Sequence, residues 1–362
     1  MYALRRAATS GPRFYSTSGQ VKPSVKLIAE LRKLTEGVSL TKAREALAAS
    51  NNNLPAALAW LDTDRAASGA AKIAKLADRV AGQGLIGVQV LSPGMRAGAG
   101  ASGSGVRAAM VELNCETDFV ARNELFNKVL GDIAHTAAFL AEPHVAADGE
   151  SLVREVSLDA LNDAPLLDHV DPLGAGSSTS PAGRVSAHAN TVGSAVRDLV
   201  TKVGEKITLR RVVGVARNPL PRHERDLGLR VFPYLHGAVT VPTNGTKGAL
   251  GLLAFQASGL QELIAHEKFQ TELGALQRSL GRTIVGFPVT KVGRPGEEDP
   301  EALYSQPSDM FMNASGRTVL EELKNWAERN GMSRGGSDDG TVAVVEFKKW
   351  SVGEPLEGTE SS

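Results

Sequence analysis

A single stretch of sequence, VELNCETDFVARN at residues 111–123, decides how the chain is expected to fold. Its first half alternates apolar and polar residues in the manner of a strand, and its second half has the residues of a helix start. Thr117 belongs to the residue types that cap helix amino termini, and Asp118 suits the positive end of a helix dipole. The stretch therefore predicts a strand that passes through a capped turn into a helix.

Phe119 can play either of two roles in this helix. It can begin a buried apolar stripe that later residues continue at helical spacing, namely Phe126, Leu130, Ile133 and Ala137. It can instead be an exposed aromatic side chain that enters a pocket of a partner protein, as interface hot spots do. Periodicity alone does not separate the two roles.

Outward from this stretch, strands and helices alternate in a pattern typical of an α+β protein. Strands are expected at residues 85–90, 107–114, 206–216, 229–236, 238–242, 250–256 and 341–350. Helices are expected at residues 119–140, 192–203, 259–280 and 318–330. The pattern of strands followed by a helix occurs twice along the chain, which predicts a core of two α+β subdomains side by side.

The two subdomains are expected at residues 66–217 and 218–355, and the first opens with a connector helix over residues 66–82. Residues 142–189 are loaded with Pro, Gly, Ser, Asp and His. We interpret them as a flexible surface insertion, with helical character only near residues 151–161.

Before this core, residues 21–65 are expected to form a small helical module. Apolar residues recur at helical spacing in three short runs, which Thr35–Ser39 and Asn51–Asn53 separate. Three helices in so short a segment predict a bundle of the ubiquitin-associated type. Such a bundle has little core of its own, so we expect it to serve as a docking module.

Both chain ends are interpreted as lying outside the folded parts. Residues 1–29 hold arginines, lysines and hydroxyl side chains but no acid before Glu30, which is typical of a mitochondrial transit peptide. We place this peptide at residues 1–18 and expect a protein of the mitochondrial matrix; a disordered basic tail is the alternative. Residues 356–362 are expected to form a disordered carboxyl-terminal tail.

The composition argues against several classes of function. The chain has 40 basic and 40 acidic residues, whereas proteins that live on nucleic acid usually carry a basic excess. Cys115 is the only cysteine, which rules out an intrachain disulfide and a cysteine-built metal site. No uncharged apolar run approaches the roughly 20 residues that cross a bilayer. We therefore expect no direct nucleic-acid or membrane partner.

Motifs for catalysis or cofactor binding are not found either. The glycines of Gly82–Gly87 fit a dinucleotide-binding loop, but they end a helix and open a strand, the reverse of what that loop requires. The histidines lack metal-binding spacing, and no pairing of a nucleophile with a base stands out. We expect the chain to be no enzyme and to bind no cofactor or metal.

A family resemblance separates the two roles of Phe119. The run NCETDFVAR at residues 114–122 resembles the signature of the elongation factor Ts family. Further segments resemble that family in the same order along the chain, at residues 31–35, 57–61, 206–212, 234–237 and 305–307. Relative to the family, Glu36 is an extra residue, and Lys42-Ala43 replaces a common Asp-Cys pair.

The resemblance implies a guanine-nucleotide exchange factor for mitochondrial elongation factor Tu. Such a factor binds the GDP-bound and nucleotide-free forms of its partner, promotes GDP release and so regenerates the GTP form during translation elongation. Phe119 would act as a wedge near the Mg²⁺ and phosphate site of the partner. The partner-binding residues of the family correspond here to Thr117, Asp118, Phe119, Val120, His236, Gly237, Leu31 and Leu40. An adaptor or scaffold of the ubiquitin-associated type, without exchange activity, is the alternative.

Overall fold

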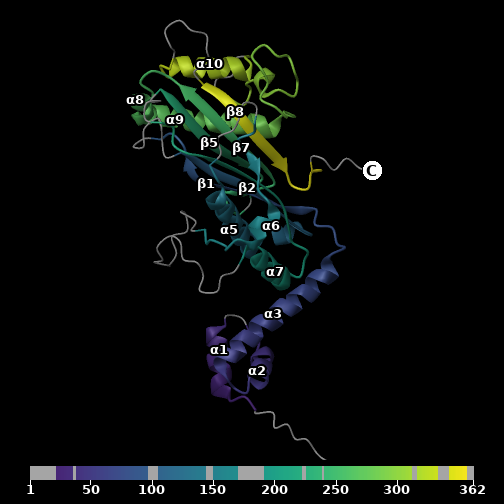
Figure 1. Cartoon of the computed structure of the whole chain (residues 1–362). Helices are drawn as coiled ribbons and strands as arrows, with labels where there is room; N and C mark the ends of the chain where they lie inside the picture. The colour runs from purple at the N-terminus through teal and green to yellow at the C-terminus, as the bar shows by residue number, and fades with distance from the viewer. Residues whose placement is uncertain are drawn as a thin grey trace, which may run out of the picture. The chain divides into compact units, whose positions relative to one another are not determined.

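The computed structural model describes residues 22–35, 38–96, 105–143, 150–169, 191–221, 226–238, 240–311, 316–332 and 342–356 (Figure 1). The chain divides into two compact units, residues 1–71 and residues 72–362. The expected transit peptide at residues 1–18 lies outside the described residues. So does the expected tail at residues 356–362, except for its first residue.

The described residues of the first unit contain three helices, α1 (Val25–Leu34), α2 (Leu40–Ala49) and α3 (Leu54–Leu76). The side chains of Ser24 and Ser39 accept hydrogen bonds from the first turns of α1 and α2, which fixes where these helices begin. The buried apolar side chains of the unit form one small core, made of Ile28, Leu31, Ala43, Ala46, Leu47, Ala57 and Leu61. The three helices expected from the sequence are confirmed.

The third of these helices is longer than the sequence predicts. α3 continues without a break into the expected connector as far as Leu76, and residues 77–82 of that connector are not helical. Its last residues belong to the second unit, where Ile73 and Leu76 pack into the core. The two compact units divide within α3, after Ala71.

The part of the second unit that the structure describes forms two antiparallel sheets. The first has five strands in the order β3-β4-β2-β1-β6, and the second has three in the order β5-β7-β8. The strands are β1 (Gln83–Pro93), β2 (Val106–Cys115), β3 (Arg154–Glu155), β4 (Thr208–Arg217), β5 (Leu227–His236), β6 (Asn244–Gly245), β7 (Lys247–Gln256) and β8 (Val342–Ser351). β6 lies between two strands of the second sheet along the chain, yet it pairs with Ile86 and Gly87 of β1. A late segment of the chain therefore completes the first sheet.

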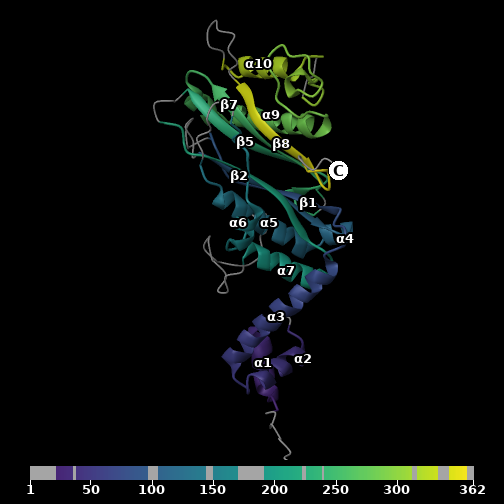
Figure 2. The same ribbon diagram turned by 45° about the vertical axis from the view of Figure 1, so that its right-hand side comes forward.

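Helices cover the outer face of each sheet. They are α4 (Asp118–Ala121), α5 (Glu124–Leu140), α6 (Leu158–Asp163), α7 (Val192–Val203), α8 (Leu260–Ala265), α9 (Glu267–Gly286) and α10 (Val319–Arg329), with a 3₁₀ turn at Leu303–Ser305. α5 and α7 pack on the first sheet, and α9 and α10 pack on the second (Figures 1 and 2). The second unit is therefore layered as helix, sheet, sheet, helix.

The alternation of side chains along β2 explains this layering. Val111 and Leu113 point toward the helices, whereas Ala108 and Met110 point toward the second sheet. β2 is thus buried on both faces, which accounts for its nearly continuous burial. The inner faces of the two sheets share one apolar core, which includes Leu250 of β7. The subdomains expected side by side are instead stacked face to face within one compact unit.

Two glycines of α9 are expected to respond in opposite ways to the same substitution. At Gly281 an added methyl group would come within 2.3 Å of the Tyr234 Cβ atom, because α9 packs closely on β5. At Gly274 it would meet only the end of the Arg278 side chain, at 3.4 Å. Gly281→Ala should lower the free energy of unfolding by about 1–3 kcal/mol. Gly274→Ala should raise it by about 0.5–1 kcal/mol, because alanine favours helices.

Urea unfolding followed by circular dichroism measures both changes. The pair is matched, because both residues lie in the interior of the same helix and gain the same methyl group. Equal changes in the unfolding midpoint of the two variants would contradict the close packing of α9 on Tyr234.

Some expected helices and strands differ from the observed ones. The helix expected at residues 119–140 is interrupted at Arg122 and Asn123, and the helix expected at residues 259–280 is interrupted at His266, where the backbone is extended. The expected strand at residues 238–242 is wrong in its described part, which contains a bend at Thr240 and the start of a turn at Pro242.

Part of the expected surface insertion at residues 142–189 is folded. Residues 150–169 contribute β3 to the edge of the first sheet and α6 beside α7. Val153 and Leu161 are buried within this segment, so it belongs to the core and is no surface loop. Residues 144–149 and 170–190 lie outside the described part of the chain.

Candidate functional site

The candidate site is the turn where β2 ends and α4 begins. The backbone of Thr117 is extended, and its Oγ1 atom accepts a hydrogen bond from the Val120 N–H at 3.4 Å, so Thr117 caps α4 as the sequence predicts. The Cys115 thiol donates to the Thr117 carbonyl at 3.1 Å. α4 thereby starts directly at the end of the central strand β2, close to β1 (Figure 2).

Phe119 projects from this turn into solvent. Its side chain is 80% exposed, whereas the stripe that periodicity extends from it is fully buried, at Phe126, Leu130, Ile133 and Ala137. The interpretation of Phe119 as the first residue of the buried stripe is therefore wrong. Its neighbours in the motif differ, because Asp118 is exposed and Thr117 and Val120 are half-buried.

The break between α4 and α5 explains how Phe119 leaves the buried face. Asn123 has an extended backbone, and its side chain accepts a hydrogen bond from the Leu125 N–H at 2.8 Å, so it caps α5 as a separate helix. The buried Asn127 then donates from Nδ2 to the carbonyls of Ala121 and Asn123, both at 2.9 Å. These two hydrogen bonds hold the carboxyl end of α4 against the first turn of α5.

Two acidic side chains fix the other end of the turn. Glu205 accepts from the Thr117 hydroxyl at 2.7 Å through Oε1 and from the Thr117 N–H at 3.1 Å through Oε2. Glu116 in turn accepts from the Lys206 N–H at 2.7 Å. Glu205 follows Gly204, the left-handed residue that ends α7. Nothing in the sequence singles out Glu205, because its partner Thr117 lies 88 positions away along the chain.

The charge on the turn is balanced in the free protein. The Asp118 carboxylate pairs with the Arg122 guanidinium at 3.0 Å, and both side chains are at least half exposed. Exposed pairs of this kind contribute only about 0–1 kcal/mol. Asp118 is therefore not an unpaired negative charge, but a partner can separate it from Arg122 with little loss of free energy.

Cys115 lies under the turn and is expected to be chemically inert in the folded protein. Its side chain is fully buried, and burial raises the pKa of the thiol from 9.0 to about 12, with the nearby Glu205 carboxylate adding to the rise. Because folding raises the pKa, the folded state favours the neutral thiol. The contribution of Cys115 to the free energy of unfolding is therefore complete below about pH 9 and is lost as the pH rises toward 12.

At pH 8 the native protein should therefore not react with a disulfide reagent such as Ellman's reagent, because the thiolate is the reacting form. The same protein unfolded in urea should react fully within minutes. Fast labelling of the native chain at pH 8 would mean that the turn opens readily and that Cys115 is not held under it.

A loop connects His236 and Gly237, which are also predicted to bind the partner, with the α4 turn. His236 and Gly237 are exposed at the end of β5, and the Thr246 N–H donates to the His236 carbonyl at 2.9 Å. Gly237 has a φ of 75°, and a side chain there would come within 2.4 Å of the Thr246 hydroxyl, so the position requires glycine. Between them in sequence, Thr240 donates to the Arg122 carbonyl at 3.5 Å.

The end of this loop is anchored to α5. Asn244 is buried and donates from Nδ2 to the Asn127 side chain at 2.8 Å, and Asn127 holds the end of α4. A cleft of about 190 Å³ lies between the loop and α5, lined in part by Asp132. Burial raises the pKa of the Asp132 carboxyl, although Lys128 at 2.6 Å opposes the rise. One loop thus connects the α4 turn, which contains Thr117–Val120, with the His236-Gly237 segment.

The two predicted residues of the helical unit differ in exposure. Leu40 is 50% exposed, as a contact residue must be. Leu31 is 0% exposed and lies inside the three-helix core, so its assignment as a direct partner contact is wrong and its role is to hold the helices together. Leu34 and Val25 are exposed on the same helix, at 61% and 83%, and were not singled out from the sequence.

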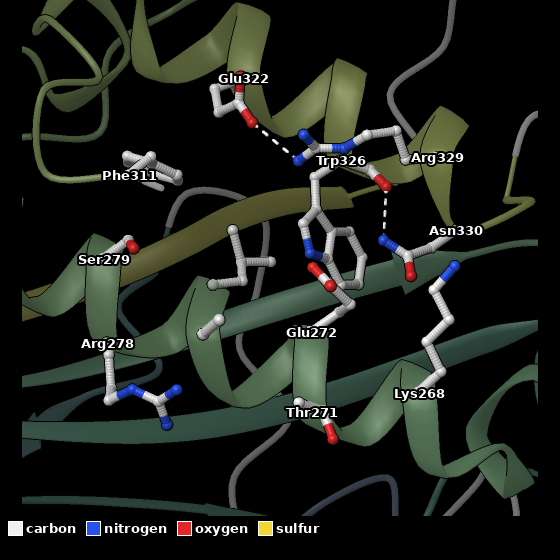
Figure 3. A pocket seen from close by; sticks show the side chains of 12 residues that line it. Lys268, Thr271, Glu272, Arg278, Ser279, Phe311, Glu322, Trp326, Arg329 and Asn330 are labelled. Carbon is white, nitrogen blue, oxygen red and sulfur yellow. Dashed lines mark hydrogen bonds and ion pairs between the residues drawn. The ribbon is translucent and has the colours of Figure 1, made fainter. Parts of the chain in front are cut away.

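A separate cavity of about 350 Å³ lies between α9 and α10 (Figure 3). The Trp326 side chain extends from α10 into its lining, and the buried Glu322 faces Arg329, whose Nη2 atom is 2.9 Å from the Glu322 carboxylate. Arg317 approaches the same carboxylate at 3.5 Å, so the buried charge is balanced. None of the residues predicted as a site lines this cavity, which lies on the outer face of the second sheet.

The described residues include no group of three or more His, Cys, Asp or Glu side chains arranged to hold a metal ion. In the part of the chain that the structure describes, no helix has both the length and the apolar character of a membrane span. What the site offers is an exposed aromatic side chain on a hydrogen-bonded turn, which is typical of a surface that docks on another protein.

Comparison with known proteins gives the family. No protein-family model matches the chain. It is 45% identical over 354 residues to the mitochondrial elongation factor Ts of Laccaria bicolor, covering 98% of both chains. It is 45% identical over 346 residues to that of Coprinopsis cinerea, covering 95% of this chain and 96% of the relative. It is 44% identical over 358 residues to mitochondrial elongation factor Ts 2 of Postia placenta, covering 98% and 99%. The chain belongs to the elongation factor Ts family, among its mitochondrial members.

Proposed function

We propose that the chain is a guanine-nucleotide exchange factor for mitochondrial elongation factor Tu and that Phe119 is its wedge. The observation that carries the proposal is the 80% exposure of Phe119 on a turn held at both ends by hydrogen bonds. A large apolar side chain held in water has a free energy to gain by entering a pocket. Family membership supports elongation factor Tu as the protein that offers the pocket.

The proposed mechanism is a difference in binding affinity and makes no covalent bond, so the chain is no enzyme. The factor binds nucleotide-free elongation factor Tu more tightly than the GDP-bound form. By thermodynamic linkage, the bound factor lowers the affinity of elongation factor Tu for GDP by the same ratio. Emptying a nearly full nucleotide site requires a preference of roughly 10⁴. One anchor does not reach that ratio, so a broad docking surface has to contribute as well.

The other residues of the turn have distinct proposed roles. Thr117 caps α4 and sets the direction of Phe119, while Val120 anchors the turn by packing against the first core. Asp118 exchanges its Arg122 partner for contacts near the Mg²⁺ and phosphate site of the GTPase, where a negative charge weakens the hold on Mg²⁺. The His236-Gly237 segment extends the contact surface, which is supported by its exposure and by the loop that connects it to α4.

The helical unit is proposed to be a docking module of the ubiquitin-associated type. Its small core and the exposure of Leu40 and Leu34 support a role in gripping a partner. Residues 21–65 form this module in the proposed division, and residues 66–217 and 218–355 form the two α+β halves of the core. These exposed leucines would equally serve an adaptor without exchange activity. The function therefore has to be tested by measuring GDP release.

The test measures release of labelled GDP from purified mitochondrial elongation factor Tu, with excess unlabelled GDP and a series of concentrations of the chain. We expect a release rate that rises with concentration and saturates. Elongation factor Tu alone and a heat-unfolded sample of the chain are the controls. Binding to elongation factor Tu without faster release would support the adaptor instead, and no binding at all would overturn both functions.

A further inference from the structure

We propose that Glu205 is a positioning residue for nucleotide exchange: its carboxylate holds Thr117, and thereby the α4 turn, in the orientation that presents Phe119. The inference rests on the proposed exchange function. Glu205 itself does not meet the partner in this proposal. It acts from within the protein, through two hydrogen bonds to the residue that caps α4.

The hydrogen bonds between Glu205 and Thr117 determine how the cap works. A threonine hydroxyl has one proton to donate, and here it goes to Glu205 Oε1 at 2.7 Å. The lone pairs of the same oxygen are then free to accept from the Val120 N–H at 3.4 Å. The Thr117 N–H goes to the second carboxylate oxygen at 3.1 Å. Glu205 thus engages both donors of Thr117 and sets the direction in which its hydroxyl accepts.

The α4 turn needs such support because it is too short to be stable alone. It has only four residues, Asp118–Ala121, and isolated helices need about 12–15 residues to form in water. Its own backbone bonds are few, with Ala121 N–H donating to Thr117 O at 3.3 Å and Arg122 N–H to Asp118 O at 3.1 Å. Hydrogen bonds to charged groups are among the stronger ones in proteins, so the carboxylate is well suited to hold the first residue.

Glu205 is in turn held at a fixed place. Gly204 ends α7 with a φ of 78°, which turns the chain toward the end of β2. The next residue, Lys206, donates its N–H to Glu116 at 2.7 Å and its Nζ to the carbonyls of Ala77 and Arg79 at 2.6 and 2.9 Å. Glu205 and Glu116 therefore form reciprocal bonds across the junction of β2 with the end of α7. The backbone on both sides of Glu205 is therefore hydrogen-bonded to neighbouring segments.

The first experiment needs no partner and follows amide hydrogen exchange in Glu205→Ala by nuclear magnetic resonance or mass spectrometry. We expect exchange at Val120, Ala121 and Arg122 to rise by about tenfold or more, while the interior of α5 stays protected. Glu205→Gln, which keeps one acceptor oxygen, should fall between the wild type and Glu205→Ala. Unchanged exchange at α4 in Glu205→Ala would overturn the proposal, whatever the function of the protein.

The second experiment measures GDP release from elongation factor Tu over a concentration series. Glu205→Ala is expected to lower the saturating release rate by about tenfold, with a change of less than about threefold in the half-saturating concentration, because the rest of the docking surface is intact. In a background that already carries Phe119→Ala, the added Glu205→Ala should have no further effect on the saturating rate.

This cycle separates positioning from a general loss of structure. Equal losses in the wild-type and Phe119→Ala backgrounds would mean that Glu205 acts on overall folding, and the proposal would be wrong. If the wild-type chain does not accelerate GDP release at all, the exchange function fails. The hydrogen-exchange result then still decides whether Glu205 holds the turn.

Discussion

Phe119→Ala is expected to slow the GDP release that the saturating wild-type chain produces by about 30-fold or more, which corresponds to an interface hot spot of about 2 kcal/mol. The reason is that the side chain is 80% exposed in the free protein, so nearly all of its apolar surface is available for burial against a partner. The fold should not suffer, because an exposed side chain contributes little to it. The free energy of unfolding should stay within about 0.5 kcal/mol of the wild type.

Phe139→Ala is the matched control. Phe139 is also an exposed phenylalanine of the same unit, at 56%, but it lies at the carboxyl end of α5 and not on the α4 turn. We expect the control to release GDP at the wild-type rate. If both variants are equally slow, the loss is not specific to the turn, and if Phe119→Ala is as fast as the wild type, Phe119 is not the wedge.

Glu112→Gln is expected to lower the free energy of unfolding of the second unit by about 3 kcal/mol, because it removes the charge from a buried ion-pair network. Glu112 is 0% exposed in β2 and lies 2.9 Å from Arg210 and 2.6 Å from Arg211. It also accepts from the Gly353 N–H at 2.9 Å, and Arg211 reaches Glu354 at 2.8 Å. The neutral side chain would leave two guanidinium groups without their main counter-charge.

The measurement is urea unfolding at neutral pH, with Glu297→Gln as the control. Glu297 also pairs with a basic side chain, Lys291 at 2.7 Å, but both side chains are partly exposed, at 48% for Lys291 and 31% for Glu297. Its substitution should leave the unfolding midpoint within error of the wild type. A wild-type midpoint for Glu112→Gln would show that the network is not needed to hold the carboxyl-terminal segment on the first sheet.

The junction of β2 with α4 could be predicted from sequence because its signals are local. Alternation along residues 107–114 indicates the strand, and Thr117 is recognisable as a cap from its type and position. The same local reasoning could have found the break at Asn123, since an Asn followed by Glu124 is also a helix start. Periodicity hid the break, because the apolar stripe of α5 appears to continue back to Phe119.

What could not be predicted depends on pairings between distant parts of the chain. The two sheets stack because β2 and β7 each present a second apolar face, and only the folded structure shows which faces meet. Glu205 lies far from Thr117 in sequence and carries no motif. Leu31 is the opposite case, since its place in an apolar stripe of α1 already indicated burial, and the family resemblance led to its assignment as a contact.

The short strand β6 makes the α4 turn depend on a distant part of the chain. Its Asn244 donates a hydrogen bond to Asn127, which holds the end of α4, and it pairs beside β1 at the edge of the first sheet. A chain truncated before residue 244 would keep the hydrogen bonds between Glu205 and Thr117 but lose this support from Asn244. The segment between the two strands β5 and β7 of the second sheet therefore helps to hold Phe119, which lies beside the first sheet.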